Sequence, residues 1–443
     1  MVIFSPVAYR LLSGGRSSWL EPVVWAGATM GVMFVVRPAA LLANDQLYFR
    51  GYGLAKHFDE VLVLTMLGAA SLYAGYFVLR PKSVVRRIPP IPDASHDGMV
   101  VVFSFACILA GLAMYGVSAA QSGVSAWDAL STGFATDSRK SSAYLYMAPT
   151  MALPAALLLY RTGTHTGSRW LKASGWAFAL LFAGILAPAG NRFTAILFIA
   201  PFLLYIMLLN GWRVRLVPAV TALAVVLGFV VTTQNFRPGE QGLSAVGSGF
   251  QTTVTHPSRA WQTLVLGPTI EMFDGLVVER QLVPDRLGYR PGSAIVTTIA
   301  QPIPRLVWPD KPYVSDAVVN EAAFGNSGVR AGDASVAYSP IGGFYYDSGW
   351  IGVMLGMALI GILLRLMWDY FENNRSNDLV RLAYSIGLPL SVLLMRGNLA
   401  DTLARALFAI GPLVLIAIAS SRTVQAVRTS GDGRIKQGRS PTT

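Results

Sequence analysis

The sequence predicts an all-α membrane protein of about ten transmembrane helices, and three observations indicate this fold. Hydrophobic residues make up 53% of the 443 residues and charged residues only 13%, whereas soluble domains carry roughly 25% charged residues. The apolar residues gather in blocks about 20 residues long, the length of a membrane-spanning helix. The basic residues collect in alternate connections between these blocks, as expected when one face is cytoplasmic.

Ten apolar blocks divide the chain. The first follows Arg10 and Arg16, as a signal peptide would, but it is long and lacks a small-residue cleavage site, so we expect a retained helix. The ninth is short and contains Pro389, which leaves its separation from the tenth open. The predicted spans are 21–43, 60–79, 98–118, 143–160, 173–189, 193–210, 215–233, 343–367, 382–396 and 402–420. We therefore expect helices one to seven in 1–233, a large periplasmic loop in 234–342, helices eight to ten in 343–420, and a disordered basic cytoplasmic tail in 421–443.

The distribution of charge predicts the orientation of these helices. Of the 35 basic residues, 19 fall in connections on one side of the predicted spans, together with only 6 acidic residues. The other side carries 16 basic and 16 acidic residues and is neutral. Cytoplasmic loops carry the excess of Lys and Arg, so both termini are expected in the cytoplasm. Membrane orientation thus accounts for the net charge of +12, and nucleic acid is not an expected partner.

The loop over residues 234–342 is too long for a plain connection and too apolar to be disordered. Apolar residues from Trp261 to Val277 recur at helical spacing, and further short helices are expected over 293–300 and over Asp316–Phe324, ending at Gly325. A glycine-rich passage, 325–343, leads into the next span. We expect a folded cap over a site at the outer membrane surface; the alternative is an external decoration without a role in a site.

Common soluble-enzyme motifs are absent from the sequence. It contains no Walker loop, no dinucleotide-binding glycine pattern, no His-Glu-x-x-His and no Gly-x-Ser-x-Gly. The single cysteine, Cys107, excludes an intrachain disulfide and a cysteine-based metal site. Of 4 histidines, only His57 and His256 are predicted to face outside. No metal and no cofactor are therefore expected.

Arginines at the outer ends of the predicted spans oppose the usual charge bias. Arg192 lies in the turn between helices five and six, and Arg396 lies at the outer end of helix nine. Charge near membrane depth costs a few kcal/mol, so such residues need a partner. One interpretation is a salt bridge to Asp401 or Asp347, or snorkelling to the surface. The other is an anion site, because the planar guanidinium fork matches phosphate oxygens; Asn191 and Asn398 would add donors.

A proline-rich strap in the loop combines charge with an aromatic ring. In Gln301-Pro-Ile-Pro-Arg-Leu-Val-Trp-Pro-Asp-Lys-Pro312, four prolines restrict the backbone while Arg305 and Lys311 flank Trp308. Aromatic faces beside cations suit sugar rings and phosphates together, and we expect the two cations to be exposed. A purely structural strap is the alternative.

These motifs together resemble the Wzy-type O-antigen polymerases, a family of oligosaccharide repeat-unit polymerases. The resemblance runs over roughly the whole chain and depends on the order and sidedness of individually weak motifs. They are Arg37-Pro38 at the end of helix one, Gly190-Asn191-Arg192, Pro304-Arg305-x-x-Trp308-Pro309-x-Lys311-Pro312, Tyr345-Tyr346-Asp347-Ser348-Gly349-Trp350-Ile351-Gly352 and Arg396-Gly397.

The resemblance implies a GT-C-like fold in the bacterial inner membrane and a metal-independent glycosyltransferase. Such enzymes join undecaprenyl-pyrophosphate-linked oligosaccharides by moving the growing glycan from its lipid pyrophosphate onto a sugar hydroxyl. It would place Arg192, Arg305 and Arg396 around the pyrophosphate, with His256 or Asp347 as the general base. Substrate contacts would come from Asn191, Trp308, Lys311, Tyr346 and Asn398.

Other functions share most of these features. An O-antigen-ligase-like lipid-glycan transferase would differ only in its acceptor. A lipid-linked glycan transporter or flippase would also hold a lipid phosphate with membrane arginines, although the large loop and the lack of a repeat of two halves disfavour it. A scaffold without enzymatic activity would not need these outer arginines. Membrane lipid is an expected partner in every case, and the sequence leaves open whether a chain-length regulator protein binds.

The charge pattern generates the first testable prediction. Reporters that work only in the periplasm should be active when fused near residue 280, because the neutral side of the protein is expected outside. Reporters that work only in the cytoplasm should be active when fused near residue 165 or near residue 375, because these connections are expected in the cytoplasm. A cytoplasmic signal from the fusion near 280 would overturn the orientation.

Overall fold

The computed structural model describes residues 18–79, 82–89, 97–121, 148–186, 192–211, 270–303, 307–330, 336 and 338–436, with a few positions between 251 and 267. Within these residues the chain is almost entirely helical, which confirms the all-α prediction. Six of the described helices are long and apolar enough to cross a membrane. The predicted span 215–233 and the first residues of 143–160 lie outside the described residues, so the count of ten remains a prediction.

The six candidate spans coincide with six of the predicted blocks. The first combines α2 (Pro22–Gly31), a π-helical segment η2 (Val32–Val36) and α3 (Arg37–Ala43), preceded by the turn η1 (Ser18–Leu20). The second combines η3 (Ala55–His57) with α4 (Phe58–Phe77). The remaining four are α6 (Asp97–Gln121), α18 (Ser339–Asn373), α19 (Asp378–Arg396) and α20 (Leu399–Lys436).

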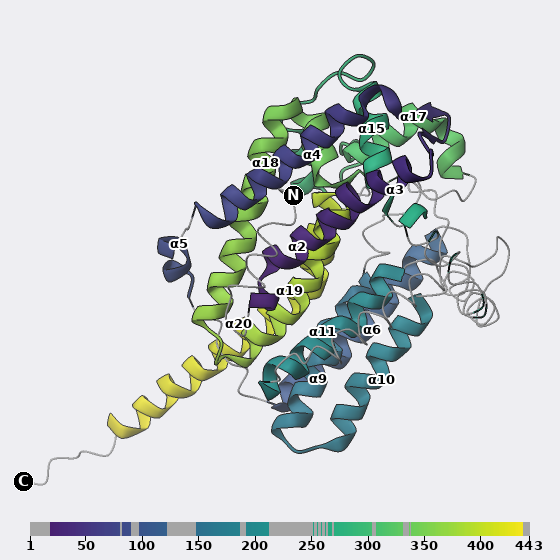
Figure 1. Ribbon diagram of the computed structural model, residues 1–443. Helices are drawn as coiled ribbons and strands as arrows, with labels where there is room; N and C mark the ends of the chain where they lie inside the picture. The colour runs from purple at the N-terminus through teal and green to yellow at the C-terminus, as the bar shows by residue number, and fades with distance from the viewer. Residues whose placement is uncertain are drawn as a thin grey trace, which may run out of the picture.

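The predicted fourth, fifth and sixth spans appear as shorter helices. They are η4 (Ala148–Met151) with α9 (Ala152–His165), α10 (Arg169–Leu186) and α11 (Arg192–Asn210). A short basic helix, α5 (Lys82–Arg87), lies between the second and third spans. Figure 1 shows α6, α9, α10 and α11 as one group, beside a second group that contains α2, α4, α18 and α19.

Three short helices follow in the predicted loop. They are α15 (Met272–Leu282), α16 (Ser293–Ala300) and α17 (Ser315–Arg330), with helical geometry interrupted at Gly325, where φ is 68°. The predictions over 293–300 and 316–324 match α16 and the first part of α17. A hairpin of β1 (Tyr48–Phe49) and β2 (Tyr52–Gly53) pairs Tyr48 with Gly53 and Phe49 with Tyr52.

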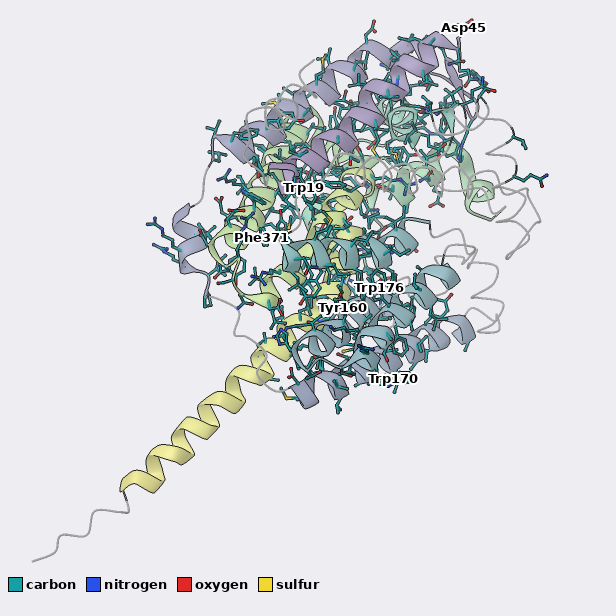
Figure 2. The ribbon with its side chains drawn as sticks, turned by 60° about the horizontal axis from the view of Figure 1, so that its bottom comes forward. Trp19, Asp45, Tyr160, Trp170, Trp176 and Phe371 are labelled. Carbon is teal, nitrogen blue, oxygen red and sulfur yellow. The ribbon has the colours of Figure 1, made fainter. Side chains whose placement is uncertain are left out.

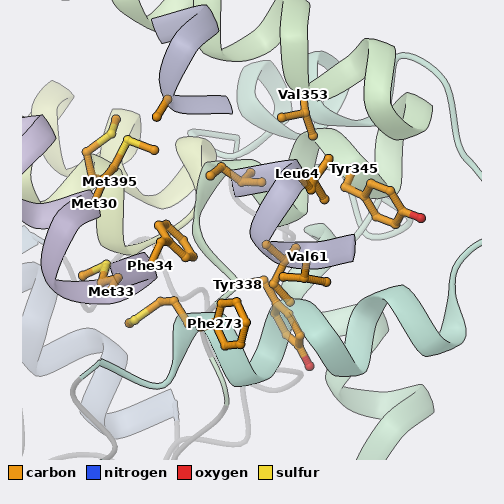
Figure 3. Packing of buried hydrophobic residues seen from close by; sticks show 14 of the residues in the cluster. Met30, Met33, Phe34, Val61, Leu64, Phe273, Tyr338, Tyr345, Val353 and Met395 are labelled. Atoms are coloured by element: carbon orange, nitrogen blue, oxygen red, sulfur yellow. The ribbon is translucent and has the colours of Figure 1, made fainter. Parts of the chain in front are cut away.

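The first hydrophobic core joins the loop helices to the spans. Phe273, Leu276 and Val277 of α15 are fully buried among residues of α2, α4 and α18. Figure 3 shows Phe273 beside Tyr338 and near Phe34 and Met33 of the first span. The part of the expected apolar face that lies in α15 therefore packs on the membrane helices, whereas Trp261 and Leu264 lie outside the described residues.

The second core holds α6, α9, α10, α11, α19 and α20 together. Its aromatic residues pack closely: Tyr160 and Trp176 have ring centroids 6.5 Å apart, and Figure 2 shows them lying close together in this group. Trp170 at the start of α10 is instead 83% exposed. The helix α19 packs against α2 and α18 on one side and α11 on the other, so it links the two cores.

A buried polar network fixes α19 where it begins. Asn377 caps α19 by accepting a hydrogen bond from the backbone N–H of Val380. Asp378 then receives Arg161 Nε of α9 at 2.9 Å and the hydroxyl of Tyr205 of α11 at 3.1 Å. Since Arg161 is 1% exposed and Asp378 7%, removing either member of this ion pair would disrupt a buried charge network. The network therefore holds α9, α11 and α19 together at the level where α19 begins.

The last span differs from its prediction. The helix α20 continues from Leu399 to Lys436, past the expected end at residue 420, so the segment predicted as a disordered tail is largely helical. The stretch Ser421–Arg428 contains no glycine or proline to terminate the helix. Charged residues in it exclude a longer membrane span, and Figure 1 shows this end of α20 projecting away from both groups.

The helices α4 and α18 run parallel and approach closely at glycines. Gly68 lies against Val353, Gly75 against the backbone of Ala358, and Gly361 against the backbone of Leu72. A Cβ atom at either Gly75 or Gly361 would overlap the neighbouring carbonyl oxygen. Small residues let membrane helices come this close, and the resulting contact is the most extensive between two helices in the described part.

This close approach generates a prediction about stability. Gly361→Ala should lower the free energy of unfolding by about 1–3 kcal/mol, because the added methyl group forces two helix backbones apart. Gly411→Ala is the matched control, since nothing lies within 4 Å of a Cβ atom at that position in α20. Thermal unfolding in detergent checks both variants. Equal melting temperatures for Gly361→Ala and the parent would contradict the tight packing.

Candidate functional site

A buried ion pair connects the first span to the loop. Arg37, the first residue of α3, donates from Nε to Asp274 Oδ2 at 2.8 Å and from Nη2 to Oδ1 at 3.1 Å. Its Nη1 donates to the carbonyl oxygen of Val265 at 3.1 Å. The side chains of Arg37 and Asp274 are 5% and 1% exposed. This bidentate pair fixes α15 against the membrane end of the first span.

A second arginine reaches the same helix from the hairpin. Arg50 occupies the tight turn between β1 and β2 with φ of 45°, followed by Gly51 with φ of 98°. Its Nη2 donates to Glu271 Oε1 at 3.1 Å, and its guanidinium lies 5.2 Å from the ring centre of Phe49. A non-glycine residue in the left-handed region is uncommon, so surrounding contacts must hold this conformation. The hairpin thereby presents Arg50 to the residue that precedes α15.

The predicted site residue Arg396 lies at the end of α19, within electrostatic range of Glu271. Burial raises the pKa of Glu271 to about 7, while Arg50, and more weakly Arg37 and Arg396, act in the opposite direction. We call Arg37, Arg50, Arg396, Glu271 and Asp274 the arginine cluster. Arg37 is paired with Asp274 and Arg50 with Glu271, and the charge of Arg396 also acts on Glu271. Three arginines from distant parts of the sequence thus gather around two acids.

An amide and carboxylate cluster lies directly beyond Arg396, in the turn between α19 and α20. Asn398 donates from Nδ2 to Asp401 Oδ2 at 3.1 Å and lies 3.5 Å from Asp316 Oδ2, while its Oδ1 accepts the backbone N–H of Asp401. Gln301, after α16, donates to Asp401 Oδ1 at 2.8 Å. This polar cluster, Asn398, Asp401, Asp316 and Gln301, joins two loop helices to the start of the last span.

A small cavity borders this polar cluster. Its lining comes from α16, the residues at the start of α17, the first turns of α18 and the start of α20, and includes Thr297, Ser315, Gly343 and Asn398. Burial raises the pKa of Asp316 to about 7, and the neighbouring charge of Asp401 acts in the same direction. Two carboxylates placed this close share protons readily, so one of them can accept a proton near neutral pH.

The predicted site residue Asp347 has a positioning role in this structure. Its Oδ1 accepts the backbone N–H of Ala294 at 2.9 Å and lies 3.3 Å from the hydroxyl of Ser293, so it caps α16. Its Oδ2 accepts the hydroxyl of Ser348 at 2.8 Å. The helix α18 breaks directly afterwards, at Ser348 and at Gly349 with φ of 62°. At this break, the Asp347 carboxylate caps α16, and the carbonyl oxygen of the adjacent Tyr346 accepts a hydrogen bond from the backbone N–H of Arg290.

Two buried polar groups next to this region have no hydrogen-bond partner. They are both carboxyl oxygens of Glu279 in α15 and the hydroxyl of the predicted site residue Tyr346. Glu279 is fully buried, and burial raises its pKa well above 4.5, with Asp316 acting in the same direction. Gly342 of α18 lies against this carboxyl, where any larger residue would collide with it. Burial therefore favours the protonated, uncharged form of Glu279.

The proline-rich strap is only partly as predicted. Trp308 is 39% exposed, as a sugar-binding ring would need to be. The expectation that Lys311 is an exposed charge is wrong: its side chain is buried and its Nζ donates to the carbonyl oxygens of Gln301 and Ile303 at 3.1 and 2.9 Å. These carbonyls follow the end of α16 at Ala300, and the ammonium satisfies them.

Several predicted site residues lie outside the described part of the chain. Asn191, His256 and Arg305 are among them, and for Arg192 only the backbone, at the start of α11, is described. Asp401 and Asp347, the carboxylates considered as partners of Arg396, accept hydrogen bonds from Gln301, Asn398 and α16. The proposed proximity of Arg192 to Arg396 stays a prediction.

Sequence reasoning missed Arg50, Glu271, Asp274 and Asp316 as site residues. Glu271 and Asp274 stand inside an apolar helical pattern in a loop, and acids there need partners. Arg37 also stands at the end of an apolar block, and these three charges could have been paired on that ground. Nothing in the sequence identifies Arg50, whose placement depends on the hairpin turn.

Comparison of the chain with protein-family models, with curated proteins and with solved structures gives no match.

The unpartnered carboxyl generates a prediction about pH. Because the pKa of Glu279 is raised in the folded protein, the folded state holds a proton that the unfolded state releases above about pH 4.5. Stability that Glu279 contributes at low pH is thus lost as pH rises towards its folded pKa. Glu279→Gln should remove this loss, so the melting temperature of the variant should rise relative to the parent from pH 5 to pH 9.

Asp285→Asn is the matched control, because it removes an exposed acid from the same loop. Its melting temperature should differ from that of the parent by the same amount at each pH. A Glu279→Gln curve that stays parallel to the parent curve would mean that Glu279 is ionised in the folded protein.

Proposed function

We propose that this protein is a membrane glycosyltransferase that joins oligosaccharides carried on undecaprenyl pyrophosphate, at the outer face of the bacterial inner membrane. The observation that supports it most is the convergence of Arg37, Arg50 and Arg396 beside the polar cluster, where the loop helices meet the ends of the spans. A pyrophosphate leaving group needs positive charge, and a sugar hydroxyl acceptor needs a base close by.

Two properties of the arginine cluster suit a lipid-linked anion: its positive charge and its position at the ends of the membrane spans. It contains three arginines and two acids, and one of the acids, Glu271, has a pKa of about 7 and so can take up a proton near neutral pH. An incoming pyrophosphate would favour that protonation, because negative charges placed close together raise one another's pKa. Anion binding and proton uptake by Glu271 are then coupled, which lets one site hold the substrate without a metal.

The transfer itself needs one displacement at the anomeric carbon of the donor glycan. The oxygen of the acceptor hydroxyl forms the new bond to that carbon, and the bond from the carbon to the pyrophosphate oxygen breaks. The electron pair leaves with undecaprenyl pyrophosphate, whose new charge Arg396 is placed to stabilise. The hydroxyl proton passes to a carboxylate of the protein. Preorganised charge of this kind contributes about 3–4 kcal/mol for a single donor.

Asp316 is the carboxylate that best fits the role of base. It lies beside the cavity lining, near Asn398, and its pKa of about 7 lets it accept a proton under physiological conditions. Asp347, the alternative expected from sequence, is engaged as the cap of α16. The described contacts therefore favour Asp316, with Asp401 as the neighbour that raises its basicity.

The prediction concerns the glycan products of a strain that carries the protein. Arg396→Ala should leave protein abundance and the melting temperature near those of the parent and reduce polymer formation about 10²- to 10³-fold, as for loss of one charge-stabilising donor. Arg396→Lys should restore little, since Lys lacks the planar fork. Asp316→Asn should also lose polymer. The matched control is Arg286→Ala, an exposed arginine of the same loop, which should keep the normal glycan ladder.

The products distinguish the competing functions. A polymerase defect leaves single repeat units on the final acceptor, because ligation is a separate step. Finished polymer that accumulates on the lipid carrier would indicate the ligase-like transferase, and lipid-linked units held on the cytoplasmic side would indicate a flippase. A normal ladder with normal abundance of Arg396→Ala would remove Arg396 from the site.

A further inference from the structure

The helix α16 has one polar face and one apolar face, and the apolar face has no partner. Ala294, Thr297 and Thr298 point to the cavity side and line it. On the opposite face, Ile295 is 61% exposed, Val296 48% and Ile299 68%. Three branched apolar side chains on one short helix face would be unfavourable in water.

The ends of α16 are attached to two different spans, which defines how the helix lies. Its first turn is capped by Asp347 at the break in α18, and Gln301 after its last turn is bonded to Asp401 in the first turn of α20. Eight residues of helix extend about 12 Å, roughly the separation of neighbouring helix axes with their side chains. α16 therefore bridges the ends of two spans and runs across them instead of alongside them.

The two spans to which α16 is attached also expose apolar residues near their attachment points. Just beyond the break in α18, Ile351 is 66% and Leu355 68% exposed, and near the start of α20, Leu403 is 47% and Leu407 48% exposed. These residues belong to helices long and apolar enough to cross the membrane, so lipid tails are their natural solvent. Because α16 is bonded to both spans at these points, it lies at the level where their lipid-facing surfaces begin.

The residues around α16 have the composition of a membrane interface. The strap that follows exposes Val307 at 73%, Trp308 at 39% and Tyr313 at 49%. Trp and Tyr are enriched where the bilayer meets water, since their rings are apolar at one end and polar at the other. Arg290, exposed before the start of α16, would meet lipid phosphates at the same level.

We infer that α16 and the strap 307–313 lie in the outer interface of the bilayer, with Ile295, Val296 and Ile299 among the lipid acyl chains. The occupant of this face is membrane lipid, because the face carries no charge and α16 is bonded to the ends of two spans that expose apolar residues nearby. The cavity behind α16 then opens at the level of lipid head groups. This inference does not depend on the proposed glycosyl transfer.

Site-directed spin labelling tests it on the full-length protein in nanodiscs of phosphatidylcholine and phosphatidylglycerol. Single cysteines at Ile295 and Ile299 receive the label, and the parent protein is the blank because Cys107 is buried. Accessibility to oxygen, which partitions into lipid, is compared with accessibility to a water-soluble nickel chelate. Leu355→Cys is the reference for lipid exposure, and Asp285→Cys is the reference for water exposure.

Labels at positions 295 and 299 should follow the Leu355 reference, with high accessibility to oxygen and low accessibility to nickel. Ile299→Asp should in addition weaken retention of α16 at the membrane, seen as raised nickel accessibility of a label at 295. Nickel accessibility at both positions equal to that of the Asp285 reference would overturn the inference. Low accessibility to both reagents, with spin–spin broadening between molecules, would instead assign this face to a second copy of the chain and would equally overturn it.

Discussion

The bidentate ion pair of Arg37 with Asp274 is the constraint on which the rest of the site depends. It forms where the first span ends and fixes the loop helix α15, whose buried face then packs on α4 and α18. Breaking a buried pair by removing one partner costs about 3–5 kcal/mol, because the other charge is left unpaired. Asp274 and Glu271 lie one turn apart, so the same attachment sets the position of Glu271 relative to Arg50 and Arg396. The π-helical segment directly before Arg37 is a local feature that is frequent at functional sites.

The second constraint is the turn between α19 and α20. It places Arg396 and Asn398 two residues apart, so that the first belongs to the arginine cluster and the second to the polar cluster. Because α19 is fixed at its beginning by Asp378, Arg161 and Tyr205, the depth of this turn is determined from the opposite end of the helix. A single well-anchored helix therefore connects a structural network at one end with the candidate site at the other.

Hydrophobic blocks and breakers in the sequence were sufficient to predict the six candidate spans, α16 and the first part of α17, since these features act locally. The roles of individual polar residues were not predictable in the same way. Lys311 was predicted as a substrate-binding cation but donates to two carbonyl oxygens that follow the end of α16. Asp347 was predicted as a base but caps α16. Arg50 joins the site only through a hairpin turn. Long-range pairing decided each of these roles, and local pattern does not encode it.

The break in α18 shows how local strain produces the geometry of the site. The helix breaks directly after Asp347, at Ser348 and at Gly349, whose positive φ of 62° favours glycine, and the carboxylate of Asp347 caps α16. Once capped, α16 is held across the span ends, and its Thr297 and Thr298 face the cavity while Gln301 reaches Asp401. The carboxylate of Asp347 lies at the beginning of α16, where a helix carries partial positive charge, while the cationic side chains of the candidate site belong to the arginine cluster. The arginine cluster and the carboxylates of the polar cluster are thus separate. A displacement with a charged leaving group requires this separation, because one group must stabilise the leaving group while another accepts the proton.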